Sequence, residues 1–358
     1  MNVLQLIDSL HAGGAERVAV NYANALVPKI ETSYLCATRA EGLLKERLSK
    51  DVPYLFLNKK SALDLKAIKR LSTYINTHKI AIIHAHASSF FLATIIKILN
   101  PRIVLIWHDH YGKSDFLKER PRFFLKCCSK FFDHVFSVNL KLERWANEVL
   151  GVKAVSYLPN YAVLGSAEQV TTLKGAQGKR ILCLANLRPQ KDHMTLLEAF
   201  KSISKKHPDW TLHLVGHDFN DAYSDRIKEF IISNGLEQHV FVYGSCLDTN
   251  HILNQSTIGV LSSKSEGLPV ALLEYGLAKL PVVATNVGDC ALVISNKDTG
   301  MLVEPENHQS LAEALISYIN DLDLRQQVAG NLQNKVKASF SESSSIEALM
   351  NLYKKHQR

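Results

Sequence analysis

Short β-branched apolar runs alternate with helical stretches along this chain, and no other feature limits the fold as much. In the first half, strands are predicted at Val3–Asp8, Ser33–Ala37, Tyr54–Leu57, Ile80–His84, Ile103–His108 and Val135–Val138. Helical stretches lie between them, for example at Ala15–Leu26, Leu63–Asn76 and Phe90–Leu99. Such alternation predicts an α/β fold, in which helices cover both faces of a parallel sheet.

A second series of strands begins after a polar segment, 166–179, which has no periodicity and reads as a linker. Its strands are predicted at Ile181–Leu184, Leu212–Val215, Val240–Tyr243, Ile258–Leu261, Val282–Ala284 and Met301–Val303. The length of 358 residues exceeds the usual size of one domain. Two Rossmann-like, doubly wound domains are therefore predicted, over 1–165 and 166–340.

Composition places the chain among ordinary globular proteins. Hydrophobic residues make up 46% and charged residues 21%, which argues against disorder. The six cysteines form no CxxC pair or disulfide framework, so a reducing compartment is expected. The N-terminus has no basic region followed by a long apolar run, and neither a signal peptide nor a membrane span is predicted. We expect a cytoplasmic protein.

Positive charge is concentrated in the first half of the chain. Residues 1–165 carry 23 Lys/Arg against 13 Asp/Glu, a net charge of +10, whereas the remainder has a net charge of −2. Within 112–132, six cations alternate with Phe and Leu residues, a mixture that suits peripheral contact with an anionic membrane at the inner face of the cell. A helix with one core face and one solvated basic face explains the same pattern. No nucleic-acid recognition motif accompanies the charge, and nucleic-acid binding is not expected.

Two carboxylates, Glu266 and Glu274, flank a predicted helix start between the strands Thr257–Leu261 and Pro281–Thr285. Pro269 suits the first helical turn. The backbone N–H groups of Gly267 and Leu268 would then lack intrahelical partners and could bind a phosphate or a sugar hydroxyl. A capped amphipathic helix with two surface acids is the simpler reading of this stretch alone.

These residues resemble the signature of the retaining glycosyltransferases of family 4, a Glu followed by Gly-x-Pro and by a second Glu eight positions after the first. Here it is formed by Glu266, Gly267, Pro269 and Glu274. The resemblance implies that Glu266 contacts the donor sugar and that Glu274 binds the ribose hydroxyls of the nucleotide.

The first half contains a further glycine loop and several strand-end histidines. Gly13 and Gly14 follow the first strand and permit close backbone approach, and the matching loop of the family lies by the donor diphosphate. The loop is not a GxGxxG, which argues against a dinucleotide-binding dehydrogenase. A tight strand-to-helix turn explains two glycines equally well.

Of the histidines, His108 best matches the family histidine that contacts the donor sugar, with His110 as the alternative. His84 and His86 end the preceding strand and are expected on the acceptor side. A metal site would also use histidines. Alternate histidines on irregular backbone more often serve packing or hydrogen bonding, and the family needs no metal, so no metal ligand is predicted.

The second half supplies a basic loop. Lys191 matches the family lysine that stabilises the leaving diphosphate. The arginine expected five positions earlier is replaced by Asn186, and Arg188 lies two positions after Asn186. Either residue could serve the phosphate. A solvated basic loop without a binding role explains the same residues. Gly216, after a strand, permits close approach to the nucleotide, and Gly244 and Ser245 are expected near the base.

The resemblance covers nearly the whole chain and implies the GT-B fold, with two domains facing across a cleft and the last helix, 341–358, packed back on the first domain. It implies a nucleotide-sugar donor, for which a UDP-sugar is expected, and no cofactor. The basic first domain points to a lipid-linked oligosaccharide acceptor in surface polysaccharide or lipopolysaccharide synthesis. Alternatives are a family member with a small soluble acceptor, a sugar-nucleotide epimerase of the same fold, and a non-catalytic sugar-nucleotide-binding subunit.

Overall fold

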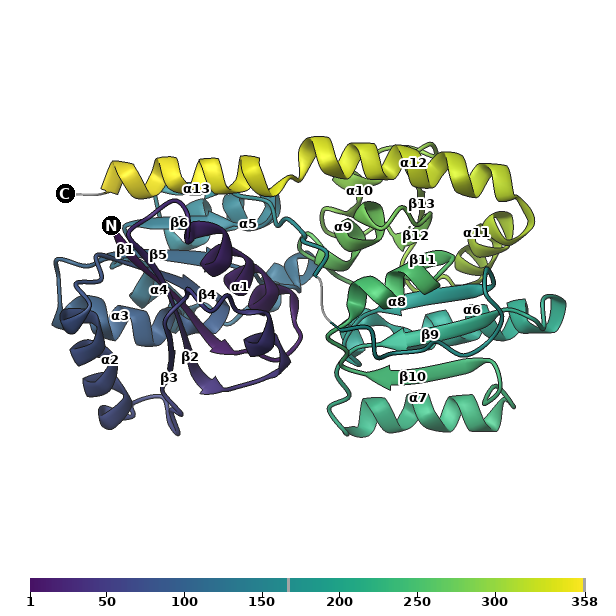
Figure 1. The fold of residues 1–358 in the computed structure, drawn as a ribbon, viewed down its shortest axis with the longest axis horizontal. Coiled ribbons are helices and arrows are strands. Elements are labelled where there is room, and N and C mark those ends of the chain that lie inside the picture. The colour runs from purple at the N-terminus through teal and green to yellow at the C-terminus, as the bar shows by residue number, and fades with distance from the viewer. Residues whose placement is uncertain (166–167, 357–358) are drawn as a thin grey trace. The chain divides into compact units, whose positions relative to one another are not determined.

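The computed structural model describes residues 1–165 and 168–356. Residues 166–167 of the predicted linker and 357–358 of the predicted last helix lie outside the described residues. The chain forms two compact units (Figure 1), of which unit 1 comprises residues 1–161 and the C-terminal segment from Glu342, and unit 2 comprises Ala162–Ser341. Among the described residues, no helix has both the length and the apolarity needed to cross a bilayer.

Unit 1 contains a parallel sheet of seven strands in the order β3-β2-β1-β4-β5-β6-β7. The strands are β1 (Asn2–Ser9), β2 (Thr32–Ala40), β3 (Tyr54–Phe56), β4 (Ile82–His86), β5 (Val104–Asp109), β6 (His134–Ser137) and β7 (Val155–Tyr157). Each predicted strand overlaps an observed one. The short edge strand β7 was not predicted, because its sequence Val-Ser-Tyr is not a continuous apolar run, unlike that of the equally short β13.

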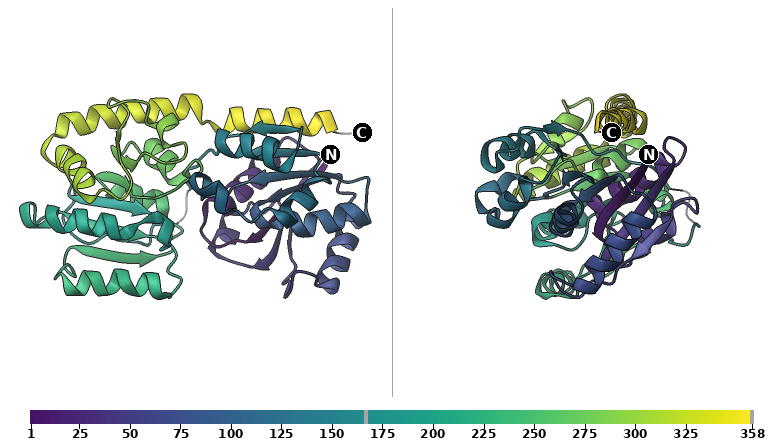
Figure 2. Two further views of the ribbon diagram at one scale, coloured as in Figure 1. Left: turned by 180° about the vertical axis from the view of Figure 1, so that it is seen from behind. Right: turned by 90° about the vertical axis from the view of Figure 1, so that its left-hand side faces the viewer.

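Helices cover both faces of this sheet. They are α1 (Gly14–Leu26), α2 (Leu65–Thr77), α3 (Phe90–Leu99), α4 (Phe123–Ser129), α5 (Leu140–Trp145) and α13 (Glu342–His356), with the 3₁₀ turns η1 (Leu43–Arg47), η2 (Ala87–Ser89) and η3 (Ser114–Glu119) and the π turn η4 (Ala146–Leu150). The helices α2 and α3 lie side by side in the views of Figures 1 and 2. The C-terminal helix α13 packs against α1.

The two faces of the unit 1 sheet differ in chemistry. One face is apolar: Leu4, Ile83 and Leu105 join a core cluster with residues of α2, α3 and α4. On the opposite face, β4 places His84 and His86, because successive side chains of a strand alternate between faces. Parallel strands covered on both faces usually read as continuous apolar runs, so the Ile-His-Ala-His ending of β4 is an exception that calls for a role.

Unit 2 contains a parallel sheet of six strands in the order β10-β9-β8-β11-β12-β13. The strands are β8 (Arg180–Leu184), β9 (Thr211–Val215), β10 (Val240–Gly244), β11 (Ile258–Leu261), β12 (Val282–Thr285) and β13 (Met301–Val303). The helices are α6 (His193–Lys206), α7 (Ala222–Ser233), α8 (Thr249–Gln255), α9 (Val270–Leu277), α10 (Cys290–Val293), α11 (His308–Asn320) and α12 (Leu322–Ser339), with the 3₁₀ turn η5 (Pro189–Lys191).

The strand order reverses direction once in each sheet, between β1 and β4 in unit 1 and between β8 and β11 in unit 2. In open parallel sheets, ligands bind beyond the carboxyl ends of the strands at such a switch point. The loops that follow β8 and β11 carry Lys191 and Glu266. Topology alone therefore brings these two predicted residues to one place in unit 2.

Candidate functional site

An ion pair lies at the switch point of unit 2. Lys191 Nζ is 2.6 Å from Glu266 Oε1, and their side chains are 22% and 6% exposed. Lys191 ends the turn η5, after which Asp192 adopts a left-handed conformation and its side chain accepts from the N–H of Thr195 to begin α6. The basic loop and the first signature glutamate thus form one charged centre that remains partly open to solvent.

Buried hydroxyls hold this centre in position. Ser263 Oγ donates to Glu266 Oε1 at 2.6 Å, and Ser262 Oγ donates to the carbonyl of Lys191 at 2.9 Å. Thr285 Oγ1, at the end of β12, donates to the carbonyl of Ser263. Sequence reasoning missed the serines, although a Ser-Ser pair directly after a buried strand and just before a functional glutamate was a usable signal.

Gly288, in the turn after β12, packs against the backbone of the same loop. Its φ of +54° belongs to the left-handed region, and a Cβ atom there would lie 2.3 Å from the carbonyl oxygen of Glu266 and 2.5 Å from that of Gly267. The N–H of Asp289 donates to the carbonyl of Gly267 at 2.8 Å. The turn after β12 therefore fixes the backbone that carries Glu266, and glycine is required by the close approach as well as by the turn.

The second signature glutamate, Glu274, lies inside α9 and is buried. Pro269 is the residue before the helix rather than a member of its first turn, with an extended backbone at φ −71° and ψ 118°. This is a small correction to the sequence prediction, and its reason is that the helix begins at Val270. Leu268 is buried as well, so this residue offers a ligand only its backbone groups.

Arg188 and Asn186 occupy different environments. The Arg188 guanidinium lies over the ring of Phe219, 4.7 Å from its centroid, and the residue is exposed. Asn186 Oδ1 accepts from the backbone N–H of His217 at 2.9 Å, which ties the loop after β8 to the loop after β9. Asn186 thus has a backbone partner, whereas Arg188 places an exposed positive charge in the same loop.

The remaining predicted nucleotide contacts lie at neighbouring strand ends. A Cβ atom on Gly216 would lie 2.1 Å from the carbonyl oxygen of Ala185, so this glycine permits two loops to approach each other. Its N–H donates to the carbonyl of Gly244, which has a φ of +68°. Ser245 follows, half-buried. These residues shape the strand-end surface beside the ion pair of unit 2.

Gly13 and Gly14 lie at the switch point of unit 1. Gly13 precedes α1 in extended conformation and Gly14 begins the helix. Asp8, at the end of β1, accepts from Ser88 Oγ at 2.7 Å and from Thr38 Oγ1 at 2.5 Å. Sequence reasoning did not select Asp8, although a carboxylate at the end of the first parallel strand is a usual ligand position.

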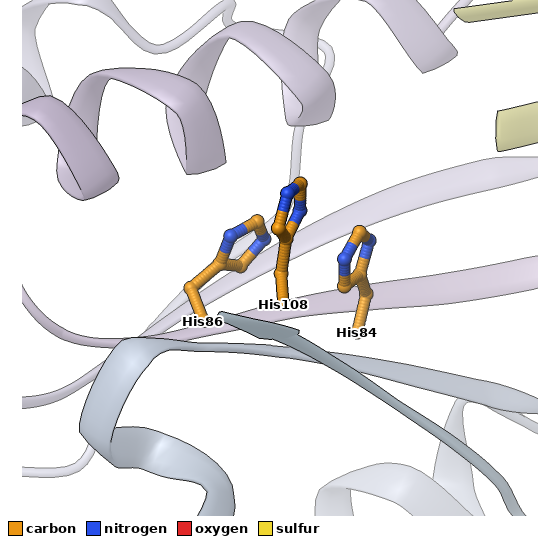
Figure 3. Close-up of side chains that lie close together, drawn as sticks. All are labelled: His84, His86 and His108. Carbon is orange, nitrogen blue, oxygen red and sulfur yellow. The ribbon is translucent and has the colours of Figure 1, made fainter. Parts of the chain in front are cut away.

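Four histidines of unit 1 form a stack on one face of the sheet: His84, His86 and His108, which Figure 3 shows, and His110. The ring centroids of His84 and His86 are 4.5 Å apart, and those of His108 and His110 are 4.1 Å apart. His84, His86 and His108 are fully buried, and desolvation by burial holds the pKa of each well below the usual value, so the rings are neutral.

This burial does not fit the roles expected for three of the histidines. Tyr22 of α1 stacks on His84 and His108, and Tyr353 of α13 hydrogen-bonds to Nδ1 of His84 at 2.7 Å. Neither a donor sugar nor an acceptor can reach these rings without displacing a helix. His110, at the end of the strand, is only half-buried and is the accessible histidine of the group.

The 112–132 segment is not one continuous helix. It consists of η3, a break and α4, in which Leu125 and Cys128 face the core. Arg120 forms a buried bidentate ion pair with Asp109 at 2.7 and 2.8 Å and is withdrawn from the surface. Phe123 and Phe124 are 73% and 68% exposed, between the exposed cations Arg122 and Lys126.

Two family models match the chain. Residues 168–335 match the model described as "Glycosyl transferases group 1", and residues 12–161 match the model "Glycosyltransferase Family 4". The first match contains the Lys191–Glu266 pair and Glu274. The second contains Gly13, Gly14 and the histidine stack.

An uncharacterized glycosyltransferase of Haemophilus influenzae is 23% identical over 96% of this chain and 96% of that protein, whereas two relatives with named activities match about half of the chain. A lipopolysaccharide core biosynthesis mannosyltransferase, LpcC, of Rhizobium leguminosarum is 27% identical over 192 residues, which are 52% of this chain and 54% of that protein. A UDP-Gal:alpha-D-GlcNAc-diphosphoundecaprenol alpha-1,3-galactosyltransferase of Escherichia coli is 27% identical over 172 residues, 48% of this chain and 44% of that protein. The matched regions therefore span about half the length of these relatives.

Among solved structures, Anabaena Alr3699/HepE in complex with UDP-glucose superimposes with a TM-score of 0.83, at 18% identity, over 99% of this chain and 100% of that one. At this identity, the likeness concerns the fold.

Proposed function

The chain belongs to glycosyltransferase family 4 and has the GT-B fold, and from that premise we propose that it is a retaining enzyme which transfers a sugar from a UDP-sugar to a hydroxyl of a lipid-linked oligosaccharide. The observation that carries the proposal is the Lys191–Glu266 pair at the switch point of unit 2. A relative named for UDP-Gal and a structural neighbour bound to UDP-glucose support the choice of nucleotide.

The residues of unit 2 divide the work of donor recognition. Glu274 accepts hydrogen bonds from the ribose hydroxyls, and Glu266 accepts from a hydroxyl of the donor sugar. Lys191 lies beside Glu266 and donates to the diphosphate, whose charge grows as the glycosidic bond breaks. Interactions that strengthen as charge develops lower the barrier to transfer.

The transfer itself is a same-face displacement. The acceptor oxygen attacks C1 of the sugar as the bond from C1 to the diphosphate oxygen breaks, through an oxocarbenium-like transition state. The acceptor proton passes to the departing phosphate oxygen, so neither a protein nucleophile nor a separate base is needed. Lys191, and Arg188 at the mouth of the loop, supply the positive charge, and this step needs no metal ion.

A lipid-linked acceptor requires access to a membrane surface. The exposed Phe123 and Phe124, flanked by Arg122 and Lys126, provide apolar anchors with cations beside them, which is the composition of an interfacial contact. Two relatives, whose names mention lipopolysaccharide and diphosphoundecaprenol, support the same class of acceptor.

Direct assay tests the proposal. Purified protein is incubated with radiolabelled UDP-Glc, UDP-Gal and UDP-GlcNAc, together with a lipid extract from a cell that makes surface polysaccharide. Label should enter the lipid fraction and UDP should be released in equal amount. Interconversion of UDP-sugars without acceptor would instead identify an epimerase, and transfer only to water-soluble acceptors would exclude the lipid-linked class.

A further inference from the structure

Three buried histidines of unit 1 are arranged as a metal site arranges its ligands. His84 and His86 are two residues apart on β4, and His108 on β5 pairs directly with His86 in the sheet register. All three rings rise from the same side of the sheet (Figure 3), and one ring nitrogen from each lies within 4.8 Å of the others. Sequence reasoning assumed irregular backbone here. Regular strands fix the spacing of the rings instead.

The cluster contains buried polar atoms that the protein leaves unsatisfied. Nε2 of His84 and both ring nitrogens of His108 have no described residue in hydrogen-bond geometry. The backbone of Leu158 lies near His108 and raises the pKa of this ring slightly, against the larger lowering by burial. The hydroxyl of Tyr22 is likewise buried without a partner among the described residues. Each such group costs about 1–3 kcal/mol unless a ligand or water satisfies it.

The ring of Tyr22 closes the cluster from α1. Its centroid lies 5.8, 6.1 and 5.9 Å from the centroids of His84, His86 and His108, so it is nearly equidistant from the three. Three histidines on a sheet thus supply three imidazole ligands, and the ring of Tyr22 covers them. Zinc commonly takes four ligands in tetrahedral geometry, with three histidines in one well-known class of site.

We propose that His84, His86 and His108 bind a late first-row transition-metal ion, of which Zn(II) is the expected one. Imidazole nitrogens are the ligands that Zn(II), Co(II) and Ni(II) prefer. Bonds of about 2.0–2.1 Å in tetrahedral geometry bring ligand nitrogens to about 3.4 Å from one another. The rings therefore draw together by about 1 Å on binding, a change that side-chain rotation supplies.

The hydrogen bonds around the cluster leave the correct nitrogens for coordination. Gln5 Oε1 is an acceptor, 2.8 Å from Nε2 of His86, so that nitrogen carries the proton and Nδ1 has the free lone pair. Nδ1 of His86 now lies 3.0 Å from Nε2 of His110, which the ion would displace. Nδ1 of His84 lies 2.7 Å from Tyr353 Oη. In the tautomer whose Nδ1–H donates to that oxygen, the lone pair of Nε2 is left for the ion. Outer partners of this kind orient the histidines of metal sites.

The site joins distant parts of unit 1. Gln5 Nε2 donates to Tyr353 Oη at 3.2 Å, so β1 and the C-terminal helix α13 meet in the shell around the histidines. None of the three histidines is among the residues proposed above for sugar transfer. The ion is therefore structural: it holds α1 and α13 against the sheet and takes no part in transfer.

The test is metal content, measured on full-length protein purified without a polyhistidine tag. Cells are grown in minimal medium with Co(II), and the protein is examined by elemental analysis and visible absorption. We expect about one ion per chain, an intense tetrahedral Co(II) spectrum, and a higher melting temperature than that of protein produced without metal. Less than about 0.1 ion per chain would overturn the proposal.

Matched variants assign the ligands. His108→Phe retains an aromatic ring but removes both nitrogens, and His84→Gln removes one ligand. His134→Gln is the control, because His134 is also buried on this sheet but bonds to Ser156 outside the cluster. The first two variants should lose the ion and the control should keep it. Equal metal content in folded His108→Phe and wild type, with folding verified by circular dichroism, would refute the assignment. The Co(II) spectrum of the wild type tests the site even if a variant fails to fold.

Discussion

Replacing Lys191 by Met removes the positive charge of the Lys191–Glu266 pair and keeps most of the side-chain volume. At 2.6 Å, the attraction between unit charges is about 6 kcal/mol for an effective dielectric constant near 20, before the cost of desolvation is subtracted. Breaking a fully buried pair costs about 3–5 kcal/mol of stability. Because Lys191 is 22% exposed, we expect a smaller loss, about 1–3 kcal/mol.

The effect on transfer should be larger and of a different kind. The Lys191 charge is needed most when the diphosphate departs, so kcat should fall by about 10²–10³-fold. KM for the donor should change far less, because ground-state binding depends mainly on Glu274 and the backbone. Radiolabelled transfer under saturating donor gives kcat, and chemical denaturation gives the stability loss separately.

Arg188→Met is the matched control, since Arg188 is a cation of the same loop but lies over Phe219 rather than beside Glu266. Its kcat should fall less than that of Lys191→Met. A Lys191→Met enzyme that is folded and keeps kcat within about threefold of wild type would refute the electrostatic role of Lys191.

Three further perturbations test other parts of the structure. Gly288→Ala places a Cβ atom against two backbone carbonyls at positive φ and should lower the free energy of unfolding by about 2–4 kcal/mol. Gly330→Ala is the control, because a Cβ atom there meets no atom within 4 Å, and it should be neutral or stabilising. Equal effects of the two variants in chemical denaturation would contradict the packing argument. Burial lowers the pKa of His134, His193 and His213 to about 4. Since an unfolded histidine titrates near 6.5, the unfolded chain binds more protons between these values, and stability should be complete above about pH 6.5 and fall toward pH 4, by at most about 1.4 kcal/mol per pH unit for each ring. Urea unfolding at pH 5 and pH 7 measures this, and equal stability at both would be inconsistent with neutral buried rings. Finally, the double variant of Phe123→Ser and Phe124→Ser should no longer be retained on vesicles of anionic lipid at low salt. The control Ile232→Ser, which replaces an exposed apolar residue of unit 2, should still be retained. Unchanged retention of the double variant would exclude α4 as the membrane contact.

The strands and most helices were predictable because their signal is local. Apolar β-branched runs between glycine-containing loops define β8 to β13 without any knowledge of the fold. The ion pair of Lys191 with Glu266 was not predicted. The family resemblance gave the two residues separate roles toward the donor, but 75 residues separate them and the strand order that brings their loops together is a property of the whole sheet.

The burial of the histidines could not be read from the sequence. The positions of His84 and His108 at predicted strand ends suggested exposure, since ligands bind there. In the structure, β4 extends to His86 and β5 to Asp109, so these histidines lie within the strands and under α1 and α13. A helix that begins at residue 342 supplies Tyr353 to a strand at residue 84, and no local pattern records that contact.

The buried pairing of Arg120 had a similar origin. Within 112–132 its charge looked like one of six surface cations, but its partner Asp109 ends β5, and Tyr111 and Trp145 stack on its guanidinium at 4.2 and 4.4 Å. Charge patterning identifies a basic segment. It does not tell which cation turns inward to a carboxylate on a neighbouring element.

Equilibrium binding of UDP tests the central claim most directly. Calorimetric titration of the wild type with UDP, GDP and ADP should show one-site binding that favours UDP, and Glu274→Ala should weaken UDP binding at least tenfold, about 1.4 kcal/mol, through loss of the ribose contact. Binding of UDP with the same affinity in wild type and Glu274→Ala, or binding of none of the three nucleotides, would contradict the assignment of unit 2 as the UDP-sugar site.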